Sequence, residues 1–107
     1  MKQLTQNLYS LKSLDKDRWE VELTDETHPV FKAHFEGNPL LPAFLQIDIL
    51  SEILSKRLIE IERAKFKLPI LPNDIVIYEI VKRIDNRYRV KITKNKKTTS
   101  EIKLVYA

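Results

Sequence analysis

Apolar and polar residues alternate along several segments of the chain, and an alternation with a period of two is typical of half-buried β-strands. In one of these segments Trp19, Val21 and Leu23 are separated from one another by glutamates. Another, residues 74–84, is rich in the β-branched side chains that strands favour. The segments that predict strands are residues 8–14, 18–24, 74–84, 87–92 and 102–106.

Short polar turns separate the last three of these segments. Asp85 and Asn86 both tolerate a positive φ and predict a two-residue hairpin turn. A looser turn is expected around residues 95–97, where an asparagine is followed by two lysines. The C-terminal part of the chain therefore predicts an antiparallel meander of three strands.

A helical period appears in residues 42–61, where apolar side chains recur every three or four positions. The apolar stripe consists of Ile47, Leu50, Leu54, Leu58 and Ile61, widened by Ile49 and Ile53. The opposite strip is polar and contains Asp48, Ser51, Glu52, Ser55 and Lys56. One long helix that buries its stripe against an antiparallel sheet predicts an α+β fold. A chain of 107 residues is expected to form a single domain, over residues 1–107.

Composition excludes several kinds of site. The chain has one Gly, two His and no Cys, so it has neither a glycine-rich phosphate loop nor a recognisable zinc spacing. These two classes of site are therefore not expected. The strand signature of RNA-binding domains is missing as well, and no nucleic acid is expected as a partner.

Charge and hydropathy bear on the partners and the location of the protein. The formal net charge of +4 suits an acidic partner such as a carrier protein, although lysine-rich surfaces usually serve only solubility. No apolar run approaches the roughly 18–20 residues that a membrane helix requires. The N-terminus has no apolar signal region. We expect a cytoplasmic protein that does not bind membranes.

Candidate chemistry is concentrated in HFEGNPLLPAFLQID, residues 34–48. His34 is a potential base, and Asp48 is a potential acid near the start of the predicted helix. Each residue alone is weak evidence, because a histidine in a loop usually packs or lies on the surface and Asp48 belongs to the polar strip. The apolar side chains that could keep water out of such a site are Phe35, Leu40, Leu41 and Phe44.

The predicted helix begins without a polar cap. Pro42 suits the first helical position, where an N–H would have no partner, but Leu41 before it cannot cap. The backbone N–H groups of Ala43 and Phe44 must therefore find another acceptor. Water or the side chain of Asn38 would satisfy them without any function. A ligand carbonyl that becomes anionic during a reaction would instead make this helix start part of a catalytic site.

This segment resembles the β-hydroxyacyl-carrier-protein dehydratases of the hotdog superfamily. Those enzymes share His-Phe-x-Gly, then Asn or Asp and Pro, two hydrophobic residues and a second Pro. An acid follows on a helix, fourteen residues after the histidine, where this chain has Asp48. The run QID, residues 46–48, also resembles the small dehydratases of aryl polyene biosynthesis. A second block, AKFKLPILPND at residues 64–74, is similar to another segment of the family, with Asn73 where Gly is usual, and the whole resemblance covers about residues 18–106.

The resemblance implies a hotdog fold, in which a curved antiparallel sheet wraps around one long central helix. It also implies that 3-hydroxyacyl thioesters on acyl carrier protein are dehydrated to trans-2-enoyl thioesters, in fatty-acid or polyene-type synthesis. His34 would be the base, the N–H of Ala43 would stabilise the thioester oxyanion, and Asp48 would be the acid. No metal or redox cofactor is required by this chemistry.

The same resemblance implies a homodimer, or a higher oligomer of dimers, in which His34 of one subunit faces Asp48 of the other. The acyl chain would occupy an apolar tunnel at the interface. The residues expected to contact the substrate are Phe35, Leu41, Ala43, Phe44 and Glu52. The basic residues expected at the mouth of the tunnel, where an acidic carrier protein would dock, are Arg63, Lys65 and Lys67.

Besides Asn73, three positions depart from the pattern of the family: Glu36 replaces Pro or Lys, Ala43 replaces Gly, and Glu52 replaces Gln. A carboxylate at position 52, one turn after Asp48, disfavours ionisation of both groups. This would help Asp48 to donate a proton, or it would mark a site that has lost its activity. Two alternatives stay open: a hotdog thioesterase in which Asp48 or Glu52 activates water, and a non-catalytic subunit that binds acyl carrier protein.

Overall fold

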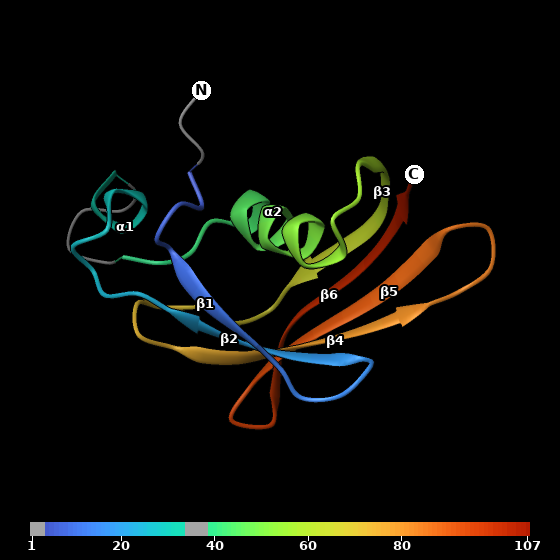
Figure 1. The fold of residues 1–107 in the computed structure, drawn as a ribbon. Helices are drawn as coiled ribbons and strands as arrows, with labels where there is room; N and C mark the ends of the chain where they lie inside the picture. The colour runs from blue at the N-terminus through green and yellow to red at the C-terminus, as the bar shows by residue number, and fades with distance from the viewer. Residues whose placement is uncertain (1–3, 34–38) are drawn as a thin grey trace.

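The structure of the chain, a computed structural model, describes residues 4–33 and 39–107 and, for Ala33, only the backbone. In this part of the chain six antiparallel strands form one curved sheet, in the order β1-β2-β4-β5-β6-β3 (Figure 1). The strands are β1 (Tyr9–Ser13), β2 (Arg18–Leu23), β3 (Leu58–Phe66), β4 (Ile75–Lys82), β5 (Arg87–Lys94) and β6 (Lys97–Tyr106). The helices are α1 (Pro29–Ala33) and α2 (Ala43–Leu54). Helix α2 lies against the concave face of the sheet, as the predicted α+β fold requires (Figure 1).

Alternation along the strands separates a buried inner face, which carries α2, from a charged outer face. On β4 and β5 the side chains of Val76, Tyr78, Val90 and Ile92 are fully buried. The antiparallel register places Tyr78 opposite Ile92, and Val90 opposite Ile102 on β6. Burial of one such side chain contributes about 1.5–3 kcal/mol to folding. The predicted C-terminal meander is therefore confirmed.

Tight turns with left-handed backbone join the strands of the meander. Asp85 and Asn86 have φ values of 57° and 59°, which confirms the predicted hairpin turn. Asn95 and Lys96, at 51° and 67°, also form a two-residue turn, so this connection is tighter than expected and β6 begins at Lys97. The other non-glycine residues described with positive φ are Asn7, Ser55 and Asn73.

The helix predicted over residues 42–61 is too long, because α2 ends at Leu54. Ser55 adopts the left-handed conformation, with φ 52° and ψ 43°. The N–H groups of Ser55 and Lys56 donate to carbonyls of the last helical turn at 3.2 and 3.3 Å. These bonds satisfy carbonyls that the helix end leaves open, as in other left-handed helix caps.

The residues that follow form the edge strand β3 instead of a further helical turn. Leu58 pairs with Tyr106 and packs against the core. Ile59 and Ile61 alternate with glutamates, which is a strand pattern. The apolar spacing from Leu54 through Leu58 to Ile61 also fits a helix, so the sequence contains both signals over this short segment.

The short helix α1 has no counterpart among the predicted elements. His28 holds its start, since Nδ1 accepts the N–H of Val30 at 3.0 Å and Nε2 lies 2.8 Å from the carbonyl of Gln6. Val30 and Phe31 are buried in the core. Within residues 4–33 and 39–107, no helix has the length and apolar content needed to cross a membrane.

The central position of α2 can be tested by truncating one of its buried side chains. Leu50 is fully buried in the core cluster, so Leu50→Ala should lower the free energy of unfolding by about 2–5 kcal/mol. Ile84 is 78% exposed, and Ile84→Ala should change it by less than about 0.5 kcal/mol. Urea denaturation followed by circular dichroism measures both. A loss at Leu50 no larger than at Ile84 would contradict the fold.

Candidate active site

The predicted site residues that the structure describes come from one stretch of the chain. His34 and Phe35 are outside the described residues. The others are on α2 or directly before it: Leu41, Ala43, Phe44, Asp48 and Glu52. Their placement follows from the start of the helix and from the face that it turns towards the sheet.

The start of α2 differs in one respect from the prediction. Pro42 is the residue before the helix rather than its first residue, because its ψ of 149° is extended. Its carbonyl accepts the first helical bonds, from Leu45 and Gln46 at 3.1 and 3.2 Å. The side chain of Pro42 makes no capping hydrogen bond, and the first turn of α2 contains no acidic residue. The positive end of the helix dipole therefore lies at Ala43 without a nearby carboxylate of its own turn.

The chain enters the helix along a fixed path. The N–H of Leu41 donates to the carbonyl of Ile70 at 2.7 Å, and the Leu41 side chain is buried in the core. Ala43 and Phe44 are exposed, and half of the Phe44 surface is accessible. An aromatic side chain in this position presents an apolar surface beside the helix start.

A buried amide without a predicted role fixes α2 on the sheet. Gln46 is 3% exposed, and its Oε1 accepts the hydroxyl of Ser100 at 2.6 Å. The side-chain Nε2 of Gln46 donates to the backbone carbonyl of Leu41 at 3.5 Å. The backbone carbonyl of Gln46 accepts the hydroxyl of Tyr78 at 2.9 Å. The signal in the sequence is a glutamine between Leu45 and Ile47, on the apolar side of the helix.

Asp48 lies on the exposed strip of α2 with a raised proton affinity. Partial burial raises the pKa of its carboxyl, and the charge of Glu52 one turn later raises it further. Ser51 on the same strip lies 2.8 Å from the hydroxyl of Tyr106, between the two oxygen atoms. Burial raises the pKa of Tyr106, the Ser51 contact lowers it, and the charge of Asp48 raises it again. The strip therefore carries a carboxyl with a raised pKa and, on Ser51, a hydroxyl that contacts the hydroxyl of Tyr106.

Glu52 is held by two hydroxyl groups from the N-terminal segment. Thr5 Oγ1 donates to Glu52 Oε2, and the hydroxyl of Tyr9 donates to Oε1 at 2.6 Å. Burial raises the pKa of Tyr9, and so do the hydrogen bond to Glu52 and its charge. Thr5 and Tyr9 are absent from the predicted site. Each carboxylate oxygen of Glu52 therefore accepts a hydrogen bond from within the chain.

The predicted basic residues lie on the edge strand or directly after it. Arg63 and Lys65 belong to β3 and line a groove on the outer face of the sheet, opposite α2. Lys67 forms an ion pair with Glu101 at 3.3 Å. Their role at the mouth of an acyl tunnel stays a prediction. Among the described residues, no cluster of three or more His, Cys, Asp or Glu side chains could hold a metal ion.

Comparison with known families and curated proteins points to dehydratases. The model of the ApeI-like family, described as ApeI dehydratase, matches residues 11–103. The chain is 34% identical over 61 residues to 3-hydroxyacyl-acyl-carrier-protein dehydratase FabZ of Fusobacterium nucleatum, a match that covers 47% of this chain and 43% of that protein. It is 36% identical over 64 residues to FabZ of a Wolbachia species, with 48% and 45% covered. The chain thus matches less than half the length of these curated relatives.

Solved structures share the fold over nearly the whole chain. A chain of the dehydratase heterocomplex ApeI:P from Xenorhabdus doucetiae matches with a TM-score of 0.76 at 22% identity, over 92% of this chain and 94% of that one. An uncharacterized protein from Erwinia carotovora subsp. atroseptica matches with a TM-score of 0.62 at 25% identity, over 92% and 90%. The hotdog fold predicted from the sequence is confirmed.

The raised pKa of Asp48 predicts a pH-dependent effect of its substitution. Folding favours the protonated carboxyl, so the stability that Asp48 contributes is complete below its ordinary pKa of 3.8 and is lost as pH rises through the raised value. Asp48→Asn avoids this loss and should raise the melting temperature at pH 7 but not at pH 3. A like-charge pair at this spacing costs roughly 0.2–0.5 kcal/mol, or about 1–4 °C in a domain of this size.

Thermal denaturation at the two pH values measures the effect. Glu22→Gln, on the exposed side of β2, removes the same charge away from α2 and is the matched control. The difference between pH 7 and pH 3 should change in Asp48→Asn and not in Glu22→Gln. Identical pH dependence in the two variants would show that Asp48 has no special environment.

Proposed function

The chain belongs to the ApeI-like family of dehydratases, and we propose that it removes water from a 3-hydroxyacyl thioester on acyl carrier protein, giving the trans-2-enoyl thioester. The observation that carries this proposal is the position of Asp48 on the second turn of α2, in surroundings that raise its pKa. A proton donor must hold its proton at the pH of the reaction, and a raised pKa favours the protonated form.

The reaction needs three groups, and the chain offers one candidate for each. Removal of the proton at C2 needs a base, for which we propose His34, a residue outside the described part of the chain. Negative charge then develops on the thioester oxygen, and the N–H of Ala43 at the positive end of the helix dipole would stabilise it. Loss of the C3 hydroxyl as water needs a proton, which Asp48 would donate. Phe35, Leu41, Phe44 and Glu52 are the further residues proposed to border the substrate.

The exposed strip of α2 supports a site that is completed by a second subunit. Asp48 is exposed in the single chain, whereas an acid catalyst gains proton affinity from further burial. The edge strand β3 is paired on one side only, with β6. Three of its apolar side chains are exposed by 41–54%: Ile59, Ile61 and Phe66. Such an edge readily pairs with another strand, and we propose that it pairs with the same strand of a second copy.

The alternative functions differ in what Asp48 and Glu52 do. A thioesterase would need one of them as a base that activates water. Both oxygens of Glu52 accept hydroxyl hydrogen bonds, which reduces its capacity as a base, and the raised pKa of Asp48 disfavours its charged form. The geometry therefore favours proton donation over activation of water. The solved relative from Xenorhabdus doucetiae belongs to a dehydratase heterocomplex, ApeI:P, so a different chain is the competing partner for the homodimer.

Activity is tested by incubation with 3-hydroxyacyl-acyl carrier protein, followed by mass spectrometry of the intact carrier. We expect a product lighter by one water. His34→Ala and Asp48→Asn should each reduce the rate by about 100-fold or more, since acid–base groups contribute about 10²–10⁴-fold. Glu22→Gln should retain the rate of the unmodified chain. Release of free carrier protein would indicate a thioesterase instead, and an unchanged carrier would indicate a non-catalytic subunit.

The proposed pairing of β3 is tested separately from the activity. Ile61→Lys places a charge on the inner side of the edge strand and should shift the mass in solution from dimer to monomer, measured by light scattering. Ile84→Lys makes the same chemical change at a side chain that is 78% exposed in the β4–β5 connection, and it should leave the dimer intact. A monomeric unmodified chain, or a dimer that survives Ile61→Lys, would exclude this interface.

A further inference from the structure

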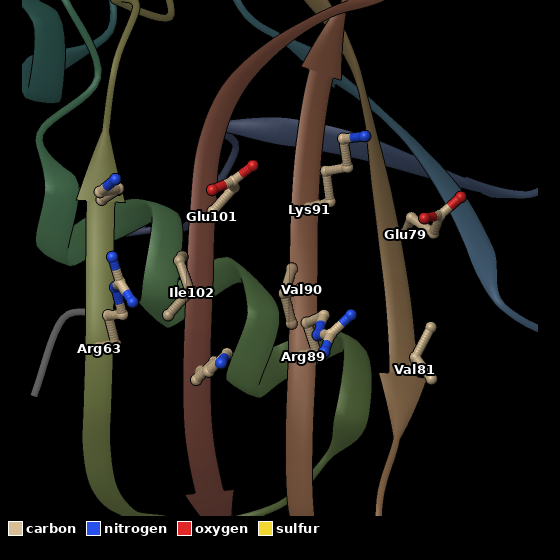
Figure 2. A pocket seen from close by; sticks show the side chains of 10 residues that line it. Arg63, Glu79, Val81, Arg89, Val90, Lys91, Glu101 and Ile102 are labelled. Atoms are coloured by element: carbon tan, nitrogen blue, oxygen red, sulfur yellow. The ribbon is translucent and has the colours of Figure 1, made fainter.

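A groove of about 420 Å³ crosses the outer face of the sheet over β3, β6, β5 and β4 (Figure 2). Figure 2 shows α2 behind the strands, so the groove and the candidate active site lie on opposite faces of the sheet. Long charged side chains border it, and the backbone at Val90 and Ile102 lies between them. The register of the strands orders these charges into two rows with different properties.

The first row alternates in sign and neutralises itself. Lys65 on β3 is opposite Glu101 on β6, and Glu101 is opposite Lys91 on β5. Lys91 is in turn opposite Glu79 on β4. Opposite charges that face each other across neighbouring strands stabilise a sheet. This row needs no further partner.

The second row, which we call the cationic row, contains Arg63, Lys103 and Arg89 on three neighbouring strands. Arg63 is opposite Lys103, and Lys103 is opposite Arg89. The row ends at Val81 on β4, which provides no carboxylate. All three cations are exposed, and none makes a hydrogen bond or ion pair through its side chain with any described residue. Like charges directly opposite each other destabilise a sheet, so an anionic partner would relieve an existing repulsion.

We propose that the cationic row is a docking site for a carboxylate-rich helix of a partner protein, laid across β3, β6 and β5. Neighbouring strands are about 4.8 Å apart, so the three cations recur at that spacing over about 10 Å. Acidic side chains at positions i, i+4 and i+7 of a helix recur at about 5–6 Å along one face. One carboxylate can therefore meet each of Arg63, Lys103 and Arg89.

Other polyanions fit this surface less well. The first row is neutral overall, so only the cationic row attracts anions, and its length of about 10 Å offers the continuous phosphate backbone of a nucleic acid few contacts. Within the described part of the chain, no aromatic side chain lines the groove, so bases would have nothing to stack on. A second copy of this chain, with its net charge of +4, would be repelled by the row. Pairing of two copies through the edge of β3 would leave this outer face accessible.

The test is binding of a fluorescent alanine-based helical peptide with glutamates at successive i, i+4 and i+7 positions. Anisotropy is measured at low salt with the full chain. The double variant Arg89→Glu and Lys103→Glu should weaken binding by about tenfold or more, since each lost ion pair also leaves a repulsive contact. Lys12→Glu with Lys16→Glu makes the same change in net charge at exposed positions outside the groove and should weaken it less than about twofold.

Three outcomes would overturn the proposal. The first is equal affinity for a peptide of the same composition with its glutamates distributed around the helix. The second is an equal effect of the groove variant and the control variant. The third is tighter binding of a DNA duplex of matched charge, which would assign the groove to nucleic acid.

If the double reversal does not fold, Lys103→Gln with Arg89→Gln should keep the melting temperature, because it removes like-charge contacts, and must still weaken peptide binding. None of these readouts depends on the proposed dehydratase activity.

Discussion

The packing of α2 into the concave face of the sheet is the constraint on which the rest of the structure depends. Apolar contacts hold the helix there, but they do not by themselves fix its rotation about its own axis. The amide of Gln46 does, because it is bonded to Ser100 on the sheet and to the carbonyl of Leu41 at the helix start. A buried amide that loses a partner costs about 1–3 kcal/mol, so other rotations of the helix are disfavoured. The orientation of Asp48 away from the sheet follows from this anchor.

The chemistry of the exposed strip then depends on contacts with the N-terminal segment. Thr5 and Tyr9 donate hydrogen bonds to Glu52 and keep its carboxylate in one position. That position is one helical turn from Asp48, whose carboxyl responds to the charge of Glu52. Burial raises the pKa of Asp48 most, and the charge of Glu52, which the fold holds in place, raises it further. The groups involved come from α2, from the edge strand β1 and from the segment that precedes β1.

The sequence predicts those features of the structure that depend on neighbouring residues, and it does not predict contacts between residues that are far apart along the chain. Period-two alternation identifies β2 and the C-terminal strands, because each has one buried and one solvated face. It fails at β3, since Leu58 and Ile61 happen to continue the helical spacing and Ser55 carries no sign of a left-handed backbone. Asp48 is found from a local pattern and a family resemblance. The hydroxyl groups that bind Glu52 come from residues 47 and 43 positions away, beyond any local pattern.

The left-handed turns of the chain have a consequence for the entropy of folding. The sequence contains a single glycine, yet several described residues, most of them Asn or Asp, adopt positive φ. Asn73 does so at 66°, at a position where similar dehydratases usually carry glycine. Glycine loses more backbone freedom on folding than any other residue, so a chain that forms its turns without it has a stiffer unfolded ensemble. The left-handed backbone costs roughly 1–2 kcal/mol per turn residue, and less for Asn and Asp. In return, the stiffer unfolded chain loses less conformational entropy on folding.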